Sequence, residues 1–215
     1  MSVDMQIPGP GGGPTDVSPV ERRVLDAMLE TISADGYQAG SFARVASRAG
    51  LTAAELEELY PDERVLLVDA MRYRDALGAA TMPDAHADGR GLLRGFLDII
   101  RYNVATPGTV ELFTMLSAAA TSPEHPGHDY FRERYAWLRG MVEDALEELE
   151  QEGELRRRAD PATVATQALA LLDGLQVQWL LDRRAIDMER LMRAFFNQHL
   201  YRKLEPARPL RLARD

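Results

Sequence analysis

The amino-acid sequence predicts an all-α protein of about nine helices. Apolar residues recur at the three- and four-residue spacing of a helix along most of the chain. No stretch alternates apolar and polar residues over the length of a strand. Serine, threonine, aspartate, proline and glycine stand where the helices would begin and end. These observations favour a fold built from packed helices alone.

The first helix is predicted from Ser18 to Gly36. Ser18-Pro19-Val20-Glu21 combines an N-cap serine, a proline at the first helical position and a glutamate three residues after the cap. The apolar positions follow at helical spacing: Val20, Val24, Leu25, Met28 and Ile32. Residues 1–17 are rich in glycine and proline and predict a flexible arm.

Two short helices around a glycine turn are predicted next. The second helix runs from Ser41 to about Arg48, and Gly50 suits the left-handed backbone of the following turn. Thr52-Ala53-Ala54-Glu55 is a capping box for a third helix, which Pro61 ends. The apolar residues of these two helices are Phe42, Val45, Ala46, Leu56, Leu59 and Tyr60. A longer helix followed by two short ones around a turn is the helix-turn-helix pattern.

A fourth helix is predicted from a cap at Asp62 to about Ala80, with Val65, Leu66, Val68, Ala70 and Met71 as its apolar residues. The loop Met82–Gly91 is rich in aspartate, glycine and proline and predicts a domain boundary. Five further helices are predicted at about Leu92–Val104, Thr109–Ala120, His128–Glu152, Pro161–Leu181 and Asp187–Lys203. The predicted organisation is an arm (1–17), a helix-turn-helix domain (18–81), a helical body (84–203) and a flexible tail (204–215).

The composition excludes several classes of protein. The chain has 215 residues, of which 46% are hydrophobic and 27% charged, as in an ordinary globular protein. The absence of cysteine excludes disulfides, thiolate catalysis and cysteine-ligated metals. No uncharged run is long enough to span a membrane, and the start of the chain has no secretory signal pattern, so we expect a cytoplasmic protein. The chain has 25 arginine and lysine residues and 34 acidic residues. The resulting net charge of -9 does not by itself favour binding to nucleic acid.

The N-terminal pattern resembles the TetR family of transcriptional regulators. The matching segments are Gly36-Tyr37, Ser41–Ala46, Ala49-Gly50-Leu51-Thr52, Leu56, Tyr60-Pro61 and Leu66-Leu67. Phe113–Ser117 and Asp173–Gln176 also look like helices of that family's ligand-binding domain. The resemblance covers most of residues 18–200 and implies a homodimer with DNA-binding heads and a ligand-binding, dimerising body. It further implies a repressor that binds a double-stranded DNA operator and is released by a small lipophilic effector.

The recognition helix departs from the family pattern because it is acidic. Family members usually present small, aromatic and basic residues here. In this chain Ala53 and Ala54 are small, but Glu57 and Glu58 stand at the aromatic and basic positions and Glu63 replaces the usual lysine. From Thr52 to Arg64 there are five acids (Glu55, Glu57, Glu58, Asp62 and Glu63) against the single Arg64.

Glutamates in such positions repel phosphates, whereas arginine and lysine contacts release counterions and promote binding. One glutamate can accept a hydrogen bond from a cytosine amino group, but consecutive residues point about 100° apart, so two cannot do so together. Arg22, Arg23 and Arg48 are further cations for phosphates. The candidate DNA contacts are Ser41, Arg44, Thr52, Ala53, Ala54, Glu57, Glu58 and Arg64. The alternative is a TetR-like ligand sensor or interaction protein that has lost direct DNA binding.

The predicted body offers a dimer surface and a ligand pocket. Ala162–Leu181 carries charge only at Asp173, and with the apolar residues of the last helix it suits a four-helix interface between two copies. Apolar walls with isolated polar groups suit a lipophilic ligand. The candidate ligand-binding residues are Phe96, Ile100, Phe113, Leu116, Tyr135, Leu138, Leu172, Gln176 and Trp179.

Catalytic and metal sites have little support in the sequence. Glu124, His125, His128 and Asp129 lie close together, but the two histidines bracket Pro126-Gly127 and do not share a helix face. Ser117 lies within a predicted helix and lacks a nucleophile-elbow motif. We therefore expect no metal, no cofactor and no enzymatic activity.

Overall fold

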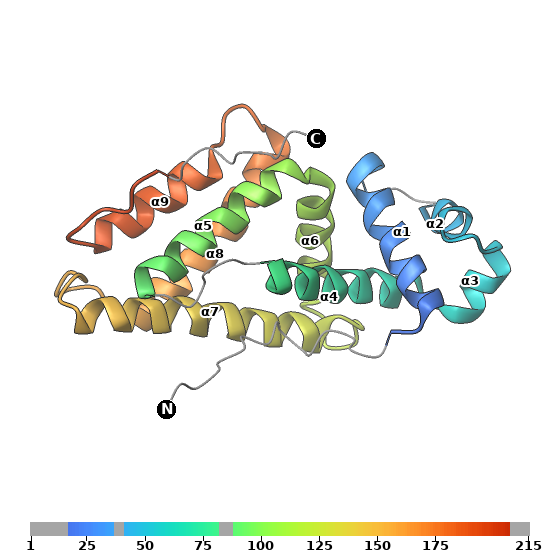
Figure 1. Ribbon diagram of the computed structural model, residues 1–215, viewed down its shortest axis with the longest axis horizontal. Helices are drawn as coiled ribbons and strands as arrows, with labels where there is room; N and C mark the ends of the chain where they lie inside the picture. Colours follow the sequence, from blue (N-terminus) through green and yellow to red (C-terminus); the bar gives the residue numbers. More distant parts are fainter. Residues whose placement is uncertain (1–16, 37–40, 82–87, 207–215) are drawn as a thin grey trace. The chain divides into compact units, whose positions relative to one another are not determined.

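The computed structural model describes residues 17–36, 41–81 and 88–206. The predicted arm up to residue 16, the tail beyond residue 206, Tyr37 and residues 82–87 of the predicted boundary loop lie outside these ranges. Within them the prediction of an all-α fold is confirmed, because the only β pairing is an isolated bridge between Leu155 and Leu200. The helices shown in Figure 1 are α1 (Pro19–Asp35), α2 (Ser41–Ala49), α3 (Ala53–Leu59), α4 (Glu63–Thr81), α5 (Gly89–Ala105), α6 (Pro107–Ala119), α7 (His128–Gln151), α8 (Pro161–Leu181) and α9 (Met188–His199).

Helices α1 and α3 begin with the capping boxes that the sequence predicts. In α1 the Glu21 backbone N–H donates to Ser18 Oγ at 3.2 Å, and the Ser18 N–H donates to Glu21 Oε2 at 2.9 Å. In α3 the Glu55 N–H donates to Thr52 Oγ1 at 3.2 Å, and the Thr52 N–H donates to Glu55 Oε2 at 2.7 Å. Each reciprocal pair satisfies backbone donors that an uncapped helix would leave without partners.

Two predicted helix ends are wrong. Helix α9 ends at His199 rather than Lys203, because Leu200 turns extended and the Tyr201 N–H donates to the Glu154 carbonyl at 2.9 Å. Helix α5 begins at Gly89 rather than Leu92, because the Asp88 carboxylate accepts from the Gly91 N–H and starts the helix earlier. Both differences arise from polar contacts that apolar periodicity does not encode.

The described chain divides into two compact units. The N-terminal unit contains Met1–Pro83 and Asn103–Leu138, and the C-terminal unit contains Asp84–Tyr102 and Arg139–Asp215. Helices α5 and α7 each contribute residues to both units. None of the described helices is both long and apolar enough to cross a membrane.

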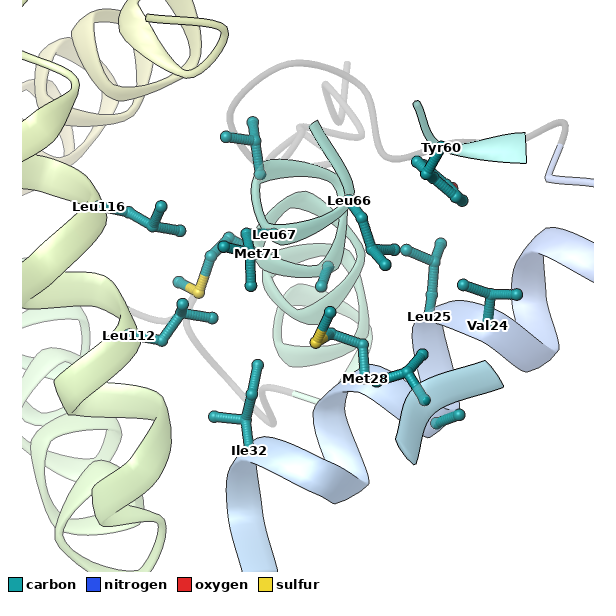
Figure 2. Packing of buried hydrophobic residues seen from close by; sticks show 14 of the residues in the cluster. Val24, Leu25, Met28, Ile32, Tyr60, Leu66, Leu67, Met71, Leu112 and Leu116 are labelled. Carbon is teal, nitrogen blue, oxygen red and sulfur yellow. The ribbon is translucent and has the colours of Figure 1, made fainter. Parts of the chain in front are cut away.

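The core of the N-terminal unit is made by apolar side chains of α1, α4 and α6. Figure 2 shows Leu66 of α4 beside Leu25 of α1, and Met71 of α4 beside Leu112 of α6. Met28 and Ile32 of α1 belong to the same buried cluster.

Three of the predicted apolar positions are exposed instead: Val20 is 38% exposed, and Leu59 and Val65 are each 37% exposed. On α4, Leu67 is buried where Val65 is not. Packing of the neighbouring helices, rather than period alone, decides which side of α4 is covered.

A close backbone contact joins α6 to α1 within this unit. A Cβ atom built on Gly108 would lie 2.0 Å from the carbonyl oxygen of Ile32 and 3.4 Å from Cα of Gly36. Real side chains do not tolerate the first separation, so glycine is required at this position. The contact sets how closely α6 approaches the last turn of α1.

In the C-terminal unit an arginine ties the start of α5 to the end of the chain. Arg90 is buried and donates to the carboxylate of Glu154 and to the backbone carbonyl of Arg202, the latter at 3.1 Å. The rings of Phe96 on α5 and Phe196 on α9 pack edge to face with centroids 6.0 Å apart. A buried cation needs acceptors for its donors, and this arrangement provides them for the two Nη atoms, while Nε has no hydrogen-bond partner among the described residues.

We expect Gly108→Ala to lower the free energy of unfolding by about 1–3 kcal/mol, because the added methyl group forces α6 away from the Ile32 carbonyl. Gly140 on α7 is a matched control, because a Cβ built there meets no atom within 4 Å beyond its chain neighbours and the backbone of its own helix. Gly140→Ala should raise stability by about 0.5–1 kcal/mol, since alanine favours the helix. Urea unfolding measures both changes, and equal effects would contradict the close contact.

Candidate nucleic-acid interface and effector site

The turn between α2 and α3 is fixed by backbone geometry and one arginine. Gly50 has a φ of 71°, in the left-handed region, and the Leu51 N–H closes the end of α2 by donating to the Ala46 carbonyl at 2.9 Å. Arg23 of α1 donates through Nε to the Ala49 carbonyl at 3.2 Å. Arg23 is therefore engaged in holding α2 on α1, which reduces its value as a phosphate contact.

Helix α3 buries one side and exposes the residues predicted to face DNA. Leu56 is fully buried and the C-cap residue Tyr60 is 7% exposed, so this side holds α3 against the unit. The exposed residues are Thr52, Ala53, Ala54, Glu57 and Glu58. The structure therefore places these five candidate contacts on one exposed segment, where small residues at the start of the helix permit close approach of a ligand.

Ser41 and Arg44 form a local pair at the start of α2. Ser41 is fully buried, and its Oγ accepts a hydrogen bond from Nη2 of Arg44 at 3.2 Å. Arg44 is half-buried, so its guanidinium is partly accessible. The structure thus places Ser41 beneath Arg44, where its hydroxyl orients the guanidinium instead of facing the solvent.

Three of the five acids near the recognition helix have partners or cover within the chain. The Glu55 carboxylate binds Thr52, and these hydrogen bonds lower the pKa of Glu55. The carboxylate of Asp62 accepts two hydrogen bonds from Arg64, from Nε at 3.0 Å and from Nη2 at 2.7 Å. These bonds lower the pKa of Asp62. Glu63 is half-buried, and burial followed by the charge of Asp62 raises its pKa. Among the described residues, Glu57 and Glu58 are therefore the exposed acids of α3 that these internal contacts do not occupy.

The candidate cations differ in how strongly they are engaged. Arg64 pairs with Asp62, so its charge is already compensated. Arg48 lies 3.7 Å from Glu30 in an exposed pair, a contact that water and salt weaken. Arg22 is exposed on α1. Arg22 and Arg48 are therefore the most accessible arginines of this segment, and Arg44 is a predicted contact that is half-buried.

The predicted ligand-binding residues fall into both units. Phe113, Leu116, Tyr135 and Leu138 belong to the N-terminal unit, and the rings of Phe113 and Tyr135 lie 6.4 Å apart. Phe96, Ile100, Leu172, Gln176 and Trp179 belong to the C-terminal unit. Leu172 and Tyr135 are half-buried and the other seven are buried, including the amide of Gln176, which is 6% exposed.

Guanidinium groups cover two of the aromatic rings in this predicted set. In the N-terminal unit the Arg134 guanidinium carbon lies 4.8 Å from the centre of the Phe113 ring. In the C-terminal unit that of Arg183 lies 5.2 Å from the centre of the Trp179 ring. Aromatic faces attract cations, and these two faces already have one.

A buried ion network joins α4 to α7 in the N-terminal unit, and the sequence gives no sign of it. The Asp75 carboxylate accepts from Nε of Arg134 at 2.6 Å and from the Tyr130 hydroxyl at 2.6 Å. Arg74 Nη1 lies 3.8 Å from the same carboxylate. Burial by itself would raise the pKa of Asp75, but the charge of Arg134 and the hydrogen bonds from Arg134 and Tyr130 outweigh it and hold the pKa below its ordinary value.

His125 and His128, the two histidines near Glu124 and Asp129, contact backbone groups of the chain. His125 Nδ1 accepts from the Gly127 N–H at 3.1 Å, and a ring nitrogen of His128 lies 2.9 Å from the Ala120 carbonyl. In the described part of the chain no three histidine or acidic side chains converge as metal ligands would. Ser117 donates its hydroxyl to the Thr114 carbonyl at 3.2 Å within α6.

A helix-turn-helix with an exposed third helix, followed by an all-α body, is the architecture of a one-chain DNA-binding regulator. The family described as "BetI-type transcriptional repressor, C-terminal" matches residues 93–204. The chain belongs to the TetR family of transcriptional regulators, which bind operator DNA and small-molecule effectors and act as dimers.

Individual relatives are similar over most of the chain. The regulator BetI of Escherichia coli K12 is 26% identical over 190 residues, which span 83% of this chain and 93% of BetI. A TetR regulator of Haloarcula marismortui has the same fold, with a TM-score of 0.71, 16% identity and coverage of 86% of this chain and 100% of its own. A regulator of Saccharomonospora viridis, solved in complex with choline, gives a TM-score of 0.66 at 21% identity, covering 82% of this chain and 93% of that one.

We expect Asp75→Asn to lower the free energy of unfolding by about 3 kcal/mol at neutral pH, because it leaves the buried charge of Arg134 unpaired. The folded-state pKa of Asp75 lies below its unfolded value, so the ion pair stabilises the fold above about pH 4. This contribution is lost as the pH falls through the folded pKa. The parent should therefore lose more stability than the variant on acidification below about pH 4.

Tyr130→Phe is the control for this network, since it removes one hydrogen bond to Asp75 and keeps the ring. It should cost about 1 kcal/mol. Chemical denaturation across a pH series measures all three proteins. Parallel pH profiles for the parent and Asp75→Asn would contradict the role given to the ion pair.

Proposed function

We propose that this protein is a cytoplasmic, non-enzymatic repressor whose head binds an operator and whose body binds a small lipophilic effector. The observation that carries the proposal is the exposed segment at Thr52–Glu58, held by a buried face of α3 and preceded by a glycine turn. In helix-turn-helix proteins this helix enters the major groove. The candidate contacts are those predicted, except that Arg64 is bonded to Asp62 and contributes little, and that Ser41 acts through Arg44.

The arrangement of charges supports DNA binding despite the net charge of -9. The carboxylate of Glu55 is hydrogen-bonded to Thr52 and that of Asp62 to Arg64, so both are oriented by contacts within the helix-turn-helix domain. Arg44 and Arg48 lie four residues apart on α2, hence on the same side of this helix, and would both contact one stretch of the phosphate backbone. Phosphate contacts would position the head, and α3 would read the bases.

Dimerisation through α8 and α9 follows from the surface of α8. Its exposed side carries Ala170, Gly174, Val177 and Leu181, of which Leu181 is 83% exposed and Val177 is 45% exposed. Small and apolar residues at helical spacing leave water readily and allow another helix to approach closely. Two copies joined here would present two heads to an operator with two half-sites.

The proposed effector acts by favouring one spacing of the two heads over another. Helix α4 follows the recognition helix directly and is bonded to α7 through Asp75, so a movement of α7 would be transmitted to the head through this ion pair. The apolar residues of the predicted ligand set favour a lipophilic molecule. The guanidinium groups over Phe113 and Trp179 disfavour a quaternary ammonium at those rings.

A second function is favoured by one observation. Glu57 and Glu58 remain exposed on α3, and carboxylates there oppose the phosphate backbone. A ligand sensor that has lost DNA binding would have the same body and would tolerate these acids. The two functions are separated by titrating the full-length dimer with DNA from upstream of its own coding sequence in a gel-shift assay at several salt concentrations.

In that assay Arg44→Ala should weaken binding to all sequences alike and reduce the salt slope by about one counterion. Arg64→Ala is the matched control and should change the slope much less, because Asp62 already compensates its charge. Equal losses from the two substitutions would contradict the assignment of Arg44. If the parent gives no retardation even at low salt, the repressor function is wrong and the sensor function is supported.

Thermal unfolding tests the effector class with decanol, decanoate and choline as probes. We expect decanol or decanoate at about 100 times its dissociation constant to stabilise the protein by about 2.7 kcal/mol and raise the melting temperature by several degrees. Choline should leave the melting temperature unchanged, because arginines cover the candidate aromatic faces. A shift with choline alone would overturn the lipophilic assignment.

A further inference from the structure

The side of α3 that faces away from the core is defined by two buried residues. Leu56 is 0% exposed and Tyr60 is 7% exposed, so both point into the N-terminal unit. Each residue of an α-helix is rotated by about 100° from the one before. Glu58 therefore lies about 200° from Leu56, on the side opposite the core, whereas Glu57 lies about 100° from Leu56, on the flank.

Ala54 lies on the same outer stripe as Glu58, because residues four apart in a helix are neighbours on its surface. Both are exposed. A methyl side chain at Ala54 lets the helix approach the bases closely, and the longer Glu58 then extends its carboxylate along the floor of the groove. No described side chain forms an ion pair with Glu58, so its carboxylate is available to a ligand.

A carboxylate only accepts hydrogen bonds, and this restricts the bases that it can contact. In the major groove guanine presents two acceptors and thymine presents an acceptor and a methyl group, so both repel it or leave it unsatisfied. Adenine offers an amino group, but its N7 acceptor lies beside it. Cytosine presents an amino donor and no acceptor of its own in the major groove, so it is the base that a carboxylate satisfies best.

We infer that Glu58 is the base-reading residue of the head and that it selects cytosine at one position in each half-site of the operator. The inference rests on the proposed function, in which α3 enters the major groove. It also gives the acidic recognition helix a positive role, because the phosphate repulsion of this carboxylate is offset only where a cytosine amino group meets it. The acid thereby raises the contrast between the correct and the wrong sequence.

The test is selection of duplexes from a randomised DNA library by the full-length protein, followed by binding measurements on the selected sequences. The parent should enrich a two-fold symmetric sequence with a cytosine in each half-site. In Glu58→Gln the side chain gains donors, and a glutamine pairs with the N6 and N7 groups of adenine. This variant should lose the cytosine preference and favour adenine at that position by about tenfold.

Glu57→Gln is the matched control, since it removes the same charge from the neighbouring residue. Both variants should bind DNA of unrelated sequence more tightly than the parent does, because each removes a charge that repels phosphates. Only Glu58→Gln should change the selected base. Glu58→Ala is a further variant in the same selection. It should lose the preference for cytosine without gaining one for adenine. Circular dichroism and thermal unfolding check that the variants fold like the parent.

The outcomes separate the inference from the function on which it rests. If the parent selects an operator but Glu58→Gln selects the same bases, or if Glu57→Gln causes the change, the inference is wrong and the function stands. If the parent enriches no sequence above background, DNA reading by this head fails and the inference fails with it. A switch from cytosine to adenine confined to Glu58→Gln supports both.

Discussion

The burial of Leu56 and Tyr60 is the constraint on which the helix-turn-helix domain depends. Helix α3 has seven residues, a length at which an isolated helix does not persist in water. Its capping box at Thr52 and the burial of these two side chains supply the stability that its own hydrogen bonds do not. The same burial fixes the rotation of α3 about its axis, and hence which residues face a ligand.

The core that receives α3 also connects it to the body. Leu66 of α4 lies beside Leu25 of α1, and Met71 of α4 lies beside Leu112 of α6 (Figure 2). Dense packing of this kind moves in discrete steps, because displacing one side chain leaves voids or clashes at its neighbours. Helix α4 therefore contacts α1 and α6 through its core residues and α7 through Asp75, which suits an element that passes a change in the body to the helix-turn-helix domain.

The charges of the head are organised by pairing within the chain. An acidic segment next to a nucleic-acid interface is unfavourable when every carboxylate faces the phosphates. Here Glu55 caps α3 and Asp62 is bonded to Arg64, so Glu57 and Glu58 are the exposed acids of this helix that these internal contacts leave unoccupied. The guanidinium of Arg44 is oriented by its hydrogen bond to the buried hydroxyl of Ser41. The net charge of the whole protein is therefore a poor guide to the chemistry of this one surface.

The sequence alone determined the all-α class, the capped starts of α1 and α3, the glycine turn and the helix-turn-helix register, because these depend on neighbouring residues. Tertiary structure alone decided the end of α9, the exposure of Leu59 and Val65 and the ion network at Asp75, since each depends on segments far apart in the chain. The candidate site divides along the same line. The sequence identified Glu58 as an acid on the recognition helix, and the burial of Leu56 decided that it points away from the core.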